Sequence, residues 1–291
     1  MQKLLLQTTI EGDPDDWAIA RFSRLRSFLA ELRNPAGYRV FEVLARDRTK
    51  RGAPDPVLSA LDASDFDQLW LFAVDIGDGL APEDCAGITR FRQRGGALMI
   101  TRDHMDLGSS LCALGGVGAA HHFHTRNPEP DPARCCVDNP FVPQISWPNY
   151  HSGDNGDFQR VRAIGSIHPV MRDRASSTGV IQYLPAHPHE GTVSAPPGDP
   201  SSRVILGGQS SVTGRRFNIA VAFERSADGG RAIAQSTFHH FADYNWDIAA
   251  GCPSFVSDPE GDGMRRFPEA LRSTKQYVRN VGFWLAGQDH A

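Results

Sequence analysis

The segment "RFRQRGGALMITRDH", residues 90–104, determines the fold that we predict. An amphipathic helix over residues 82–94 ends at Gly95 and Gly96, and the apolar run ALMIT, residues 97–101, follows as a buried strand. A helix that leads into a buried strand is the unit of a parallel sheet covered by helices. Ligands of such sheets bind beyond the carboxyl ends of the strands. The polar residues directly after ALMIT are therefore well placed for function.

The same alternation continues on both sides of this segment. Upstream, apolar runs predict strands at residues 3–8, 38–44 and 65–74, with a helix over about 17–32. Downstream, we predict strands at 203–206, 217–223 and 232–237, and a closing helix at 273–285. The expected fold is α/β and doubly wound, with a mainly parallel sheet, helices on both faces and long loop insertions. The late strands should join the same sheet, the first two of them as a hairpin.

Length and composition favour one globular domain over residues 1–291, with a loop-rich insertion at about 125–160. The net charge of −4 argues against a nucleic-acid partner. No run approaches the roughly 18 apolar residues of a membrane helix, and the N-terminus lacks a signal-peptide pattern, so we expect a cytoplasmic protein without a membrane partner. Five cysteines without framework spacing predict reduced thiols. Assembly into a homo-oligomer stays open.

Three polar clusters contain most of the histidines: RDHMD at 102–106, HHFH at 121–124 and HHFADYN at 239–245. Each has a structural interpretation: a helix start capped by aspartates, a strand with alternate residues in water, and a turn built on Asp and Asn. The first and third clusters, however, follow strands that a parallel sheet directs to one edge. We therefore expect a shared pocket that binds a small-molecule substrate.

Residue chemistry assigns the roles in this pocket, since histidine is an acid or base near neutral pH and aspartate can orient it. The expected catalytic residues are His104, His240, Asp103 and Asp106. The expected substrate-binding residues are Arg102, His239, Asp243 and Asn245.

Two of these assignments depend on strand alternation. Past the end of a strand, His239 and His240 should point to opposite sides, and we favour His240 as the pocket residue because Asp243 follows it in a loop. Within a strand, His122 and His124 would share a face, which makes them the candidate ligands of a divalent metal such as zinc.

The order of these motifs resembles the ThuA-like (trehalose utilisation) family of the class I glutamine amidotransferase-like superfamily. The similar features are FDQLWLF, the helix and Gly-Gly strand ending at His104 with Asp106, the segment LGGVGAAHHFH, the His168-Pro169 pair, and the strand GGRAIAQSTFHHF. The family's Asp-Glu-x-Tyr region is not evident, and LPAHPHEG stands near its place. The resemblance covers roughly residues 1–30, 66–125, 165–185 and 228–242.

This resemblance implies a flavodoxin-like fold and an enzyme of small-molecule or carbohydrate metabolism. Amidotransferases of the superfamily place a nucleophilic cysteine after the strand that corresponds to ALMIT, where this chain has Asp103 and His104. The resemblance therefore excludes a Cys-dependent glutaminase of that type. We expect a hydrolase, lyase or isomerase that acts on a small polar, sugar-derived metabolite. The alternative is a catalytically silent amidotransferase-like module that binds a metabolite or a protein partner.

Overall fold

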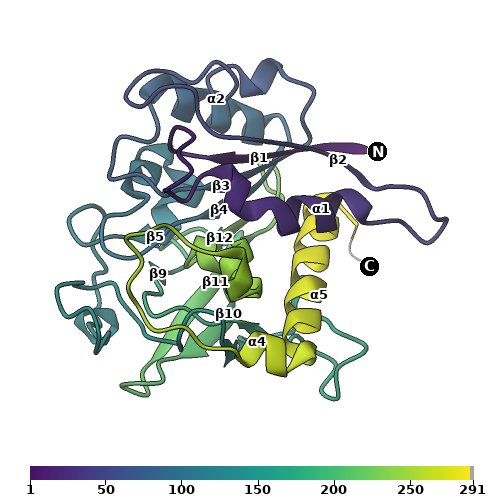
Figure 1. Ribbon diagram of the computed structural model, residues 1–291. Coiled ribbons are helices and arrows are strands. Elements are labelled where there is room, and N and C mark those ends of the chain that lie inside the picture. Colours follow the sequence, from purple (N-terminus) through teal and green to yellow (C-terminus); the bar gives the residue numbers. More distant parts are fainter. Residues whose placement is uncertain (289–291) are drawn as a thin grey trace.

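The computed structural model describes residues 1–288, and an eight-stranded sheet forms its centre (Figure 1). The strands follow the order β2-β1-β3-β4-β12-β11-β10-β7. Five of them are mutually parallel: β1 (Gln2–Thr8), β2 (Phe41–Arg46), β3 (Gln68–Phe72), β4 (Ala97–Thr101) and β12 (Ala232–Gln235). The other three strands each pair antiparallel with their neighbours: β11 (Arg216–Phe223), β10 (Ser202–Gln209) and β7 (Arg162–Ala163). The fold is α/β and flavodoxin-like, as predicted.

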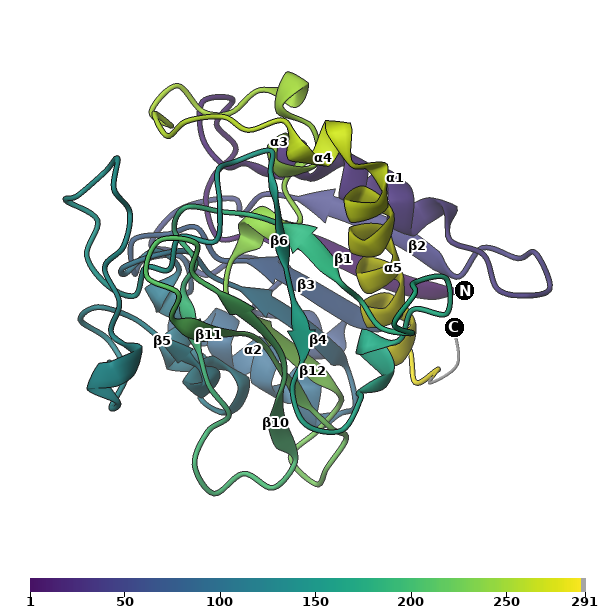
Figure 2. The same ribbon diagram turned by 90° about the horizontal axis from the view of Figure 1, so that it is seen from below.

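Helices cover both faces of the sheet because the inner parallel strands β1, β3, β4 and β12 are buried on both sides. On one face lie α1 (Ser23–Glu31) and α5 (Pro268–Leu285), which Figures 1 and 2 show side by side. Leu4 and Leu6 of β1 pack into the core on this face. The neighbouring Leu5 packs into the other core, against α2 (Pro82–Gln93). The alternation along a single strand thus assigns α1 and α5 to one layer and α2 to the other.

The late part of the chain extends the sheet as predicted. β10 and β11 form the expected antiparallel hairpin, and β12 returns to pair in parallel with β4. The carboxyl ends of β4 and β12 are therefore adjacent, since Thr101 pairs with Gln235. This register brings the polar segments that follow the two strands together at one edge of the sheet.

Two details differ from the sequence-based expectation. The connection between β2 and β3 contains a short 3₁₀ turn, Leu61–Ala63, and no α-helix among its residues. The first helix begins later than the predicted residue 17, at Ser23, after a 3₁₀ turn at Ile19–Phe22. Its first backbone N–H groups, those of Ser23 and Arg24, donate to the carboxylate of Asp243, so the cap comes from a distant part of the chain.

The segment between β4 and β10 is built mainly from loops. Its short strands are β5 (His121–His122), paired with β9 (Thr192–Val193), and β6 (Phe158–Arg160), paired with β8 (Tyr183–Pro185). Two short helices, α3 (Asp243–Trp246) and α4 (Gly263–Arg266), precede α5. Among residues 1–288, none of the helices has the length and apolar character that a membrane crossing requires.

Candidate active site with a three-histidine centre

A cavity of about 360 Å³ lies beyond the carboxyl ends of the parallel strands. The loops after β4 and β12 supply Asp103, His104 and His239 to its lining. The loop after β8 adds His187 and His189. Loops from distant parts of the chain thus bring several imidazoles to one place, at the edge of the sheet that the topology predicts.

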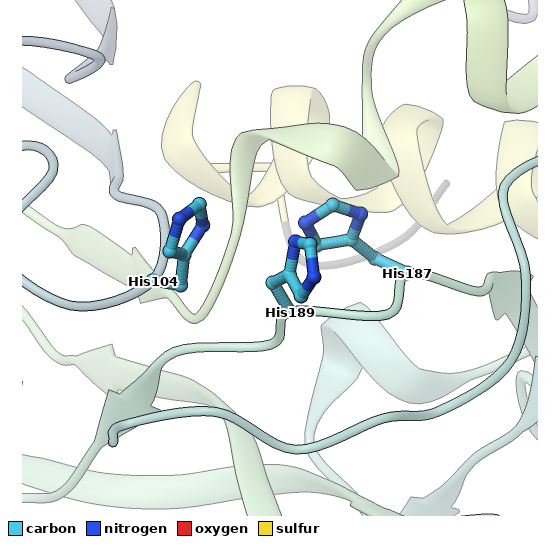
Figure 3. A group of neighbouring side chains, drawn as sticks. All are labelled: His104, His187 and His189. Carbon is cyan, nitrogen blue, oxygen red and sulfur yellow. The ribbon is translucent and has the colours of Figure 1, made fainter. Parts of the chain in front are cut away.

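Three of these histidines, His104, His187 and His189, lie next to one another (Figure 3). One ring nitrogen from each lies within 4.8 Å of the corresponding nitrogens of the other two. The ring of His189 is tilted by 57° from that of His104 and by 83° from that of His187. Rings that are not parallel can direct their in-plane lone pairs at a common centre, which metal binding requires.

Each of the three rings also contacts a carboxylate or an amide oxygen of a second residue. Such contacts fix the orientation and the tautomer of metal-binding histidines. The contacts are His104 Nδ1 with Asp103 Oδ2 at 3.2 Å, His187 Nδ1 with Asn155 Oδ1 at 3.2 Å, and His189 Nε2 with Asp258 Oδ1 at 3.4 Å. The arrangement has the donor set of a three-histidine zinc site with an open fourth position.

A second group of neighbouring ligand atoms consists of Asp103, His187 and His239. It suits a metal less well, because the rings of His187 and His239 are stacked, with centroids 3.5 Å apart and planes 13° apart. Lone pairs that lie in two parallel ring planes do not converge on one ion. His239 is better placed as an acid or base, with its Nε2 3.8 Å from Asp103 Oδ2.

Two asparagines determine the tautomers of the stacked pair. The Nδ1 of His239 lies 2.9 Å from Asn245 Oδ1, and Asn245 Nδ2 donates to Asn155 Oδ1 at 2.8 Å. Since both amide oxygens are acceptors, His239 and His187 must each donate their Nδ1–H to an asparagine. Their Nε2 atoms lie 3.4 and 3.8 Å from the carboxylate oxygens of Asp103, which is itself almost fully buried.

The floor of the cavity consists of Asp103, His104, His187, His189 and His239. Its electrostatics follow from the burial of these groups next to one another. Burial alone would raise the pKa of Asp103, but His104, His187 and His239 together hold it well below its usual value. Burial, and then the neighbouring His239, hold the pKa of His187 well below its ordinary value, although Asp103 opposes this. Near neutral pH the floor therefore combines the carboxylate of Asp103 with the neutral imidazole of His187, an environment that favours a cation.

The structure reverses the predicted orientation of the histidine pair that follows β12. His239 and His240 do point to opposite sides, but His239 lines the cavity, whereas His240 is completely buried behind it. The imidazole of His240 contacts Glu190 Oε1 at 2.9 Å and Gln235 Nε2 at 2.7 Å. The prediction failed because Asp243, the residue that favoured His240, turns away to cap α1.

Two other predicted residues of the first cluster support the loop instead of lining the cavity. The guanidinium of Arg102 is buried, donates to the carbonyl oxygen of Met105 and lies over the ring of Phe123. The carboxylate of Asp106 accepts from the backbone N–H and the hydroxyl of Thr125. Both side chains satisfy backbone or loop groups locally, which sequence position alone does not reveal.

The predicted metal pair, His122 and His124, lies apart from the three-histidine centre. Strand β5 ends at His122, so the two side chains do not share a strand face. The ring of His122 contacts Ser194 and the carbonyl oxygen of Asn127, whereas the exposed His124 lies near Ser146. Neither of the metal-type groups found in residues 1–288 includes them.

Four residues of the site were not predicted from the sequence: His187, His189, Asn155 and Asp258. The two histidines occur in AHPHEG, which has the same H-x-H spacing as the pair at 122 and 124. A strand ending before this motif would have been the signal, since β8 stops at Pro185. The insertion at 125–160 also lines the cavity, through Val142, Ile145 and Asn155.

Comparison with known proteins adds a likeness in fold. No protein-family model matches the chain. No curated protein matches it either. Among solved structures, the mmIFT52 N-terminal domain is similar over 99% of both chains, with a TM-score of 0.54 and 9% identity.

Two further similar structures are proteins described as ThuA-like. The match with the protein from Bacteroides uniformis ATCC 8492 covers 98% of this chain and 91% of that chain, with a TM-score of 0.47 and 13% identity. The match with the protein from Parabacteroides merdae ATCC 43184 covers 99% of this chain and 91% of that chain, with a TM-score of 0.47 and 14% identity. At these identities the likeness concerns the fold, and the ThuA-like proteins among the similar structures carry the name of the family that the sequence motifs resemble.

Proposed function

We propose that the protein is a metal-assisted enzyme that acts on a small metabolite, with a zinc-type ion held by His104, His187 and His189. The observation that carries this proposal is the convergence of the three rings, each with a second polar partner. Buried polar atoms without a hydrogen bond support it, since His187 Nε2 and Asp103 Oδ1 are among them. A cation among these atoms would compensate their desolvation.

A zinc-type ion at this position would polarise a carbonyl oxygen or lower the pKa of a bound water. The residues of the chain supply the rest. Asp103 Oδ2 lies 3.2 Å from His104 Nδ1, a contact that orients this ring. His239, with its Nδ1–H donated to Asn245, presents Nε2 to the cavity as a general base.

This combination of an electrophile and a base serves hydrolases, lyases and isomerases alike, the classes that the sequence favours. The resemblance to ThuA-like proteins adds sugar derivatives to the candidate substrates. The ligand that reaches the floor needs at least one polar group, a carbonyl or carboxylate oxygen, to complete the coordination of the ion.

Metal analysis of the purified protein tests the proposal. After removal of metal with a chelator and reloading with zinc, the wild-type chain should retain one ion, and His189→Ala should lose it. The matched control is His124→Ala, which removes an exposed histidine outside the centre and should retain the ion.

Two outcomes contradict the metal proposal: a wild-type protein without stoichiometric metal, or equal retention by His189→Ala and His124→Ala. Stoichiometric metal without turnover of keto-sugars, sugar acids, esters or amides would instead favour the alternative of a catalytically silent binding module.

A further inference from the structure

The mouth of the cavity is chemically different from its floor. Whereas histidines and carboxylates form the floor, the walls above it come from the loops after β3 and β4, from the insertion and from the loop that precedes α4. These walls carry aliphatic side chains: Val74, Ile76, Leu107, Val142, Ile145 and Val256. Four separate chain segments thus contribute the same kind of surface to one opening.

We propose that the substrate is amphipathic: a small carbonyl or carboxyl derivative whose polar head reaches the histidine floor and whose alkyl or aryl group lies against the aliphatic mouth. This inference rests on the proposed function, because the floor determines the head group. It narrows that function, since it disfavours polyhydroxylated sugars and predicts a substrate with an apolar part.

Exposure of large apolar side chains at the mouth is the first argument. Ile76 is 67% exposed and Phe255 60% exposed, and both line the cavity. Large apolar side chains that gather around a cavity on a protein surface mark binding sites, because covering them removes apolar surface from water. A ligand with an apolar group would cover these two side chains, whereas a hydroxylated chain would leave its own hydroxyls against them.

The polar groups of the walls give the second argument, because most of them already have protein partners. Asn155 Oδ1 accepts from His187 and Asn245, and Asp258 Oδ1 contacts His189 and accepts from Asn139. A sugar needs a hydrogen-bond partner for each hydroxyl that it buries.

The polar groups at the entrance are committed in the same way. The guanidinium of Arg51 lies 3.4 Å from the carboxylate of Asp78, and Asp16 accepts from the backbone of Trp17. With most of its polar groups paired and its aliphatic side chains half-buried or exposed, the wall suits an apolar group.

The size of the cavity agrees with such a ligand. Its volume of about 360 Å³ falls near the lower end of the roughly 300–1,000 Å³ typical of small-molecule sites. Predominantly apolar walls with a few convergent polar groups are also typical of these sites. The polar floor would fix the orientation of the ligand, and the mouth would select its apolar part.

Hydroxamic acids test the inference, because their head group chelates zinc and their chain can be varied. Binding of acetohydroxamic, butanohydroxamic and hexanohydroxamic acids is measured by calorimetry with zinc-loaded and metal-free protein. D-gluconohydroxamic acid, which has the chain length of the hexano compound but carries hydroxyls, is the sugar-like comparator.

We expect the affinity of the zinc-loaded protein to rise about three- to fourfold for each added methylene. The hexano compound should bind at least tenfold more tightly than the glucono compound. Ile76→Ser should weaken the dependence on chain length. Its matched control, Ile167→Ser, changes another exposed isoleucine that lies outside the cavity, and should leave the dependence unchanged.

The outcomes separate the two proposals. Binding that needs zinc but does not depend on chain length, or that favours the glucono compound, would overturn the amphipathic substrate and leave the metal centre standing. Chain-length dependence that is the same with and without zinc would support the apolar mouth and count against the metal centre. Failure of every compound to bind would overturn both.

Discussion

The imidazole rings of His187 and His239 stack face to face, with centroids 3.5 Å apart and planes 13° apart. They come from loops that lie 52 positions apart in the chain, and each donates its Nδ1–H to an asparagine. The stacking separates their roles, because parallel lone pairs cannot bind one ion together. In the proposed function His187 therefore belongs to the three-histidine centre with His104 and His189, and His239, which lines the cavity, is the proposed acid or base.

The first prediction concerns His239. On a verified substrate, His239→Ala should lower kcat by roughly 10²–10⁴, because a general base contributes about that factor. Zinc content should stay at the wild-type level, since His239 lies outside the three-histidine group. Steady-state kinetics and metal analysis of the same preparation check this. Loss of zinc together with activity would mean that His239 is a ligand after all.

The second prediction concerns His240, which has the opposite role. Its ring is fully buried against the buried carboxylate of Glu190. His240→Ala leaves that buried carboxylate with only the neutral donors Ser152, Gln159 and Ser236, so the free energy of unfolding should fall by about 3–5 kcal/mol. Urea denaturation measures the loss. A stable His240→Ala variant with greatly reduced turnover would contradict this and restore the catalytic role predicted from the sequence.

The third prediction concerns Asn245, a positioning residue. Asn245→Ala removes the acceptor that holds the Nδ1–H of His239. Loss of such a partner should lower kcat/KM by about 10–100-fold and shift the pH profile of the base, while zinc is retained. Asn245→Gln is less disruptive if its amide still reaches the ring, and should recover part of the activity. An unchanged pH profile in Asn245→Ala would show that the amide is only structural.

The fourth prediction concerns acid stability away from the site. Burial alone would raise the pKa of Asp55, but Arg46 and the backbone N–H groups of Leu58 and Thr49 hold it well below its usual value. A depressed carboxyl pKa stabilises the fold above the unfolded pKa, about 4, and this contribution is lost as the pH falls below that value. Asp55→Asn should therefore be less stable than wild type at pH 7, and the difference should shrink below pH 4. A difference that is constant with pH would contradict the assignment.

Much of the fold follows from local patterns in the sequence. Strand β4 matches its predicted range of 97–101, and the β10–β11 hairpin and the return of β12 to the sheet are confirmed. Apolar runs and Gly-Gly breaks are local signals, so a single sequence contains them. The late start of α1 was not predictable in this way, because its cap is the distant Asp243.

The site was predictable only in part, for a related reason. Asp103 and His104 follow a strand whose end is evident in the sequence, and both line the cavity. His187 and His189 follow β8, a strand of three residues in a proline-rich segment, which has no periodicity to identify it. The orientation of the pair at 239 and 240 depends on which partner each ring finds, and those partners lie far away in the chain.

The most direct measurement for the central claim is X-ray absorption spectroscopy of the zinc-loaded protein. The account predicts one zinc ion with three imidazole ligands at about 2.0–2.1 Å and one further oxygen ligand. His187→Ala should lower the number of imidazoles or abolish binding, and His124→Ala should leave the spectrum unchanged. A wild-type spectrum without imidazole ligands would contradict the three-histidine centre. A spectrum of His187→Ala identical to that of the wild type would contradict it as well.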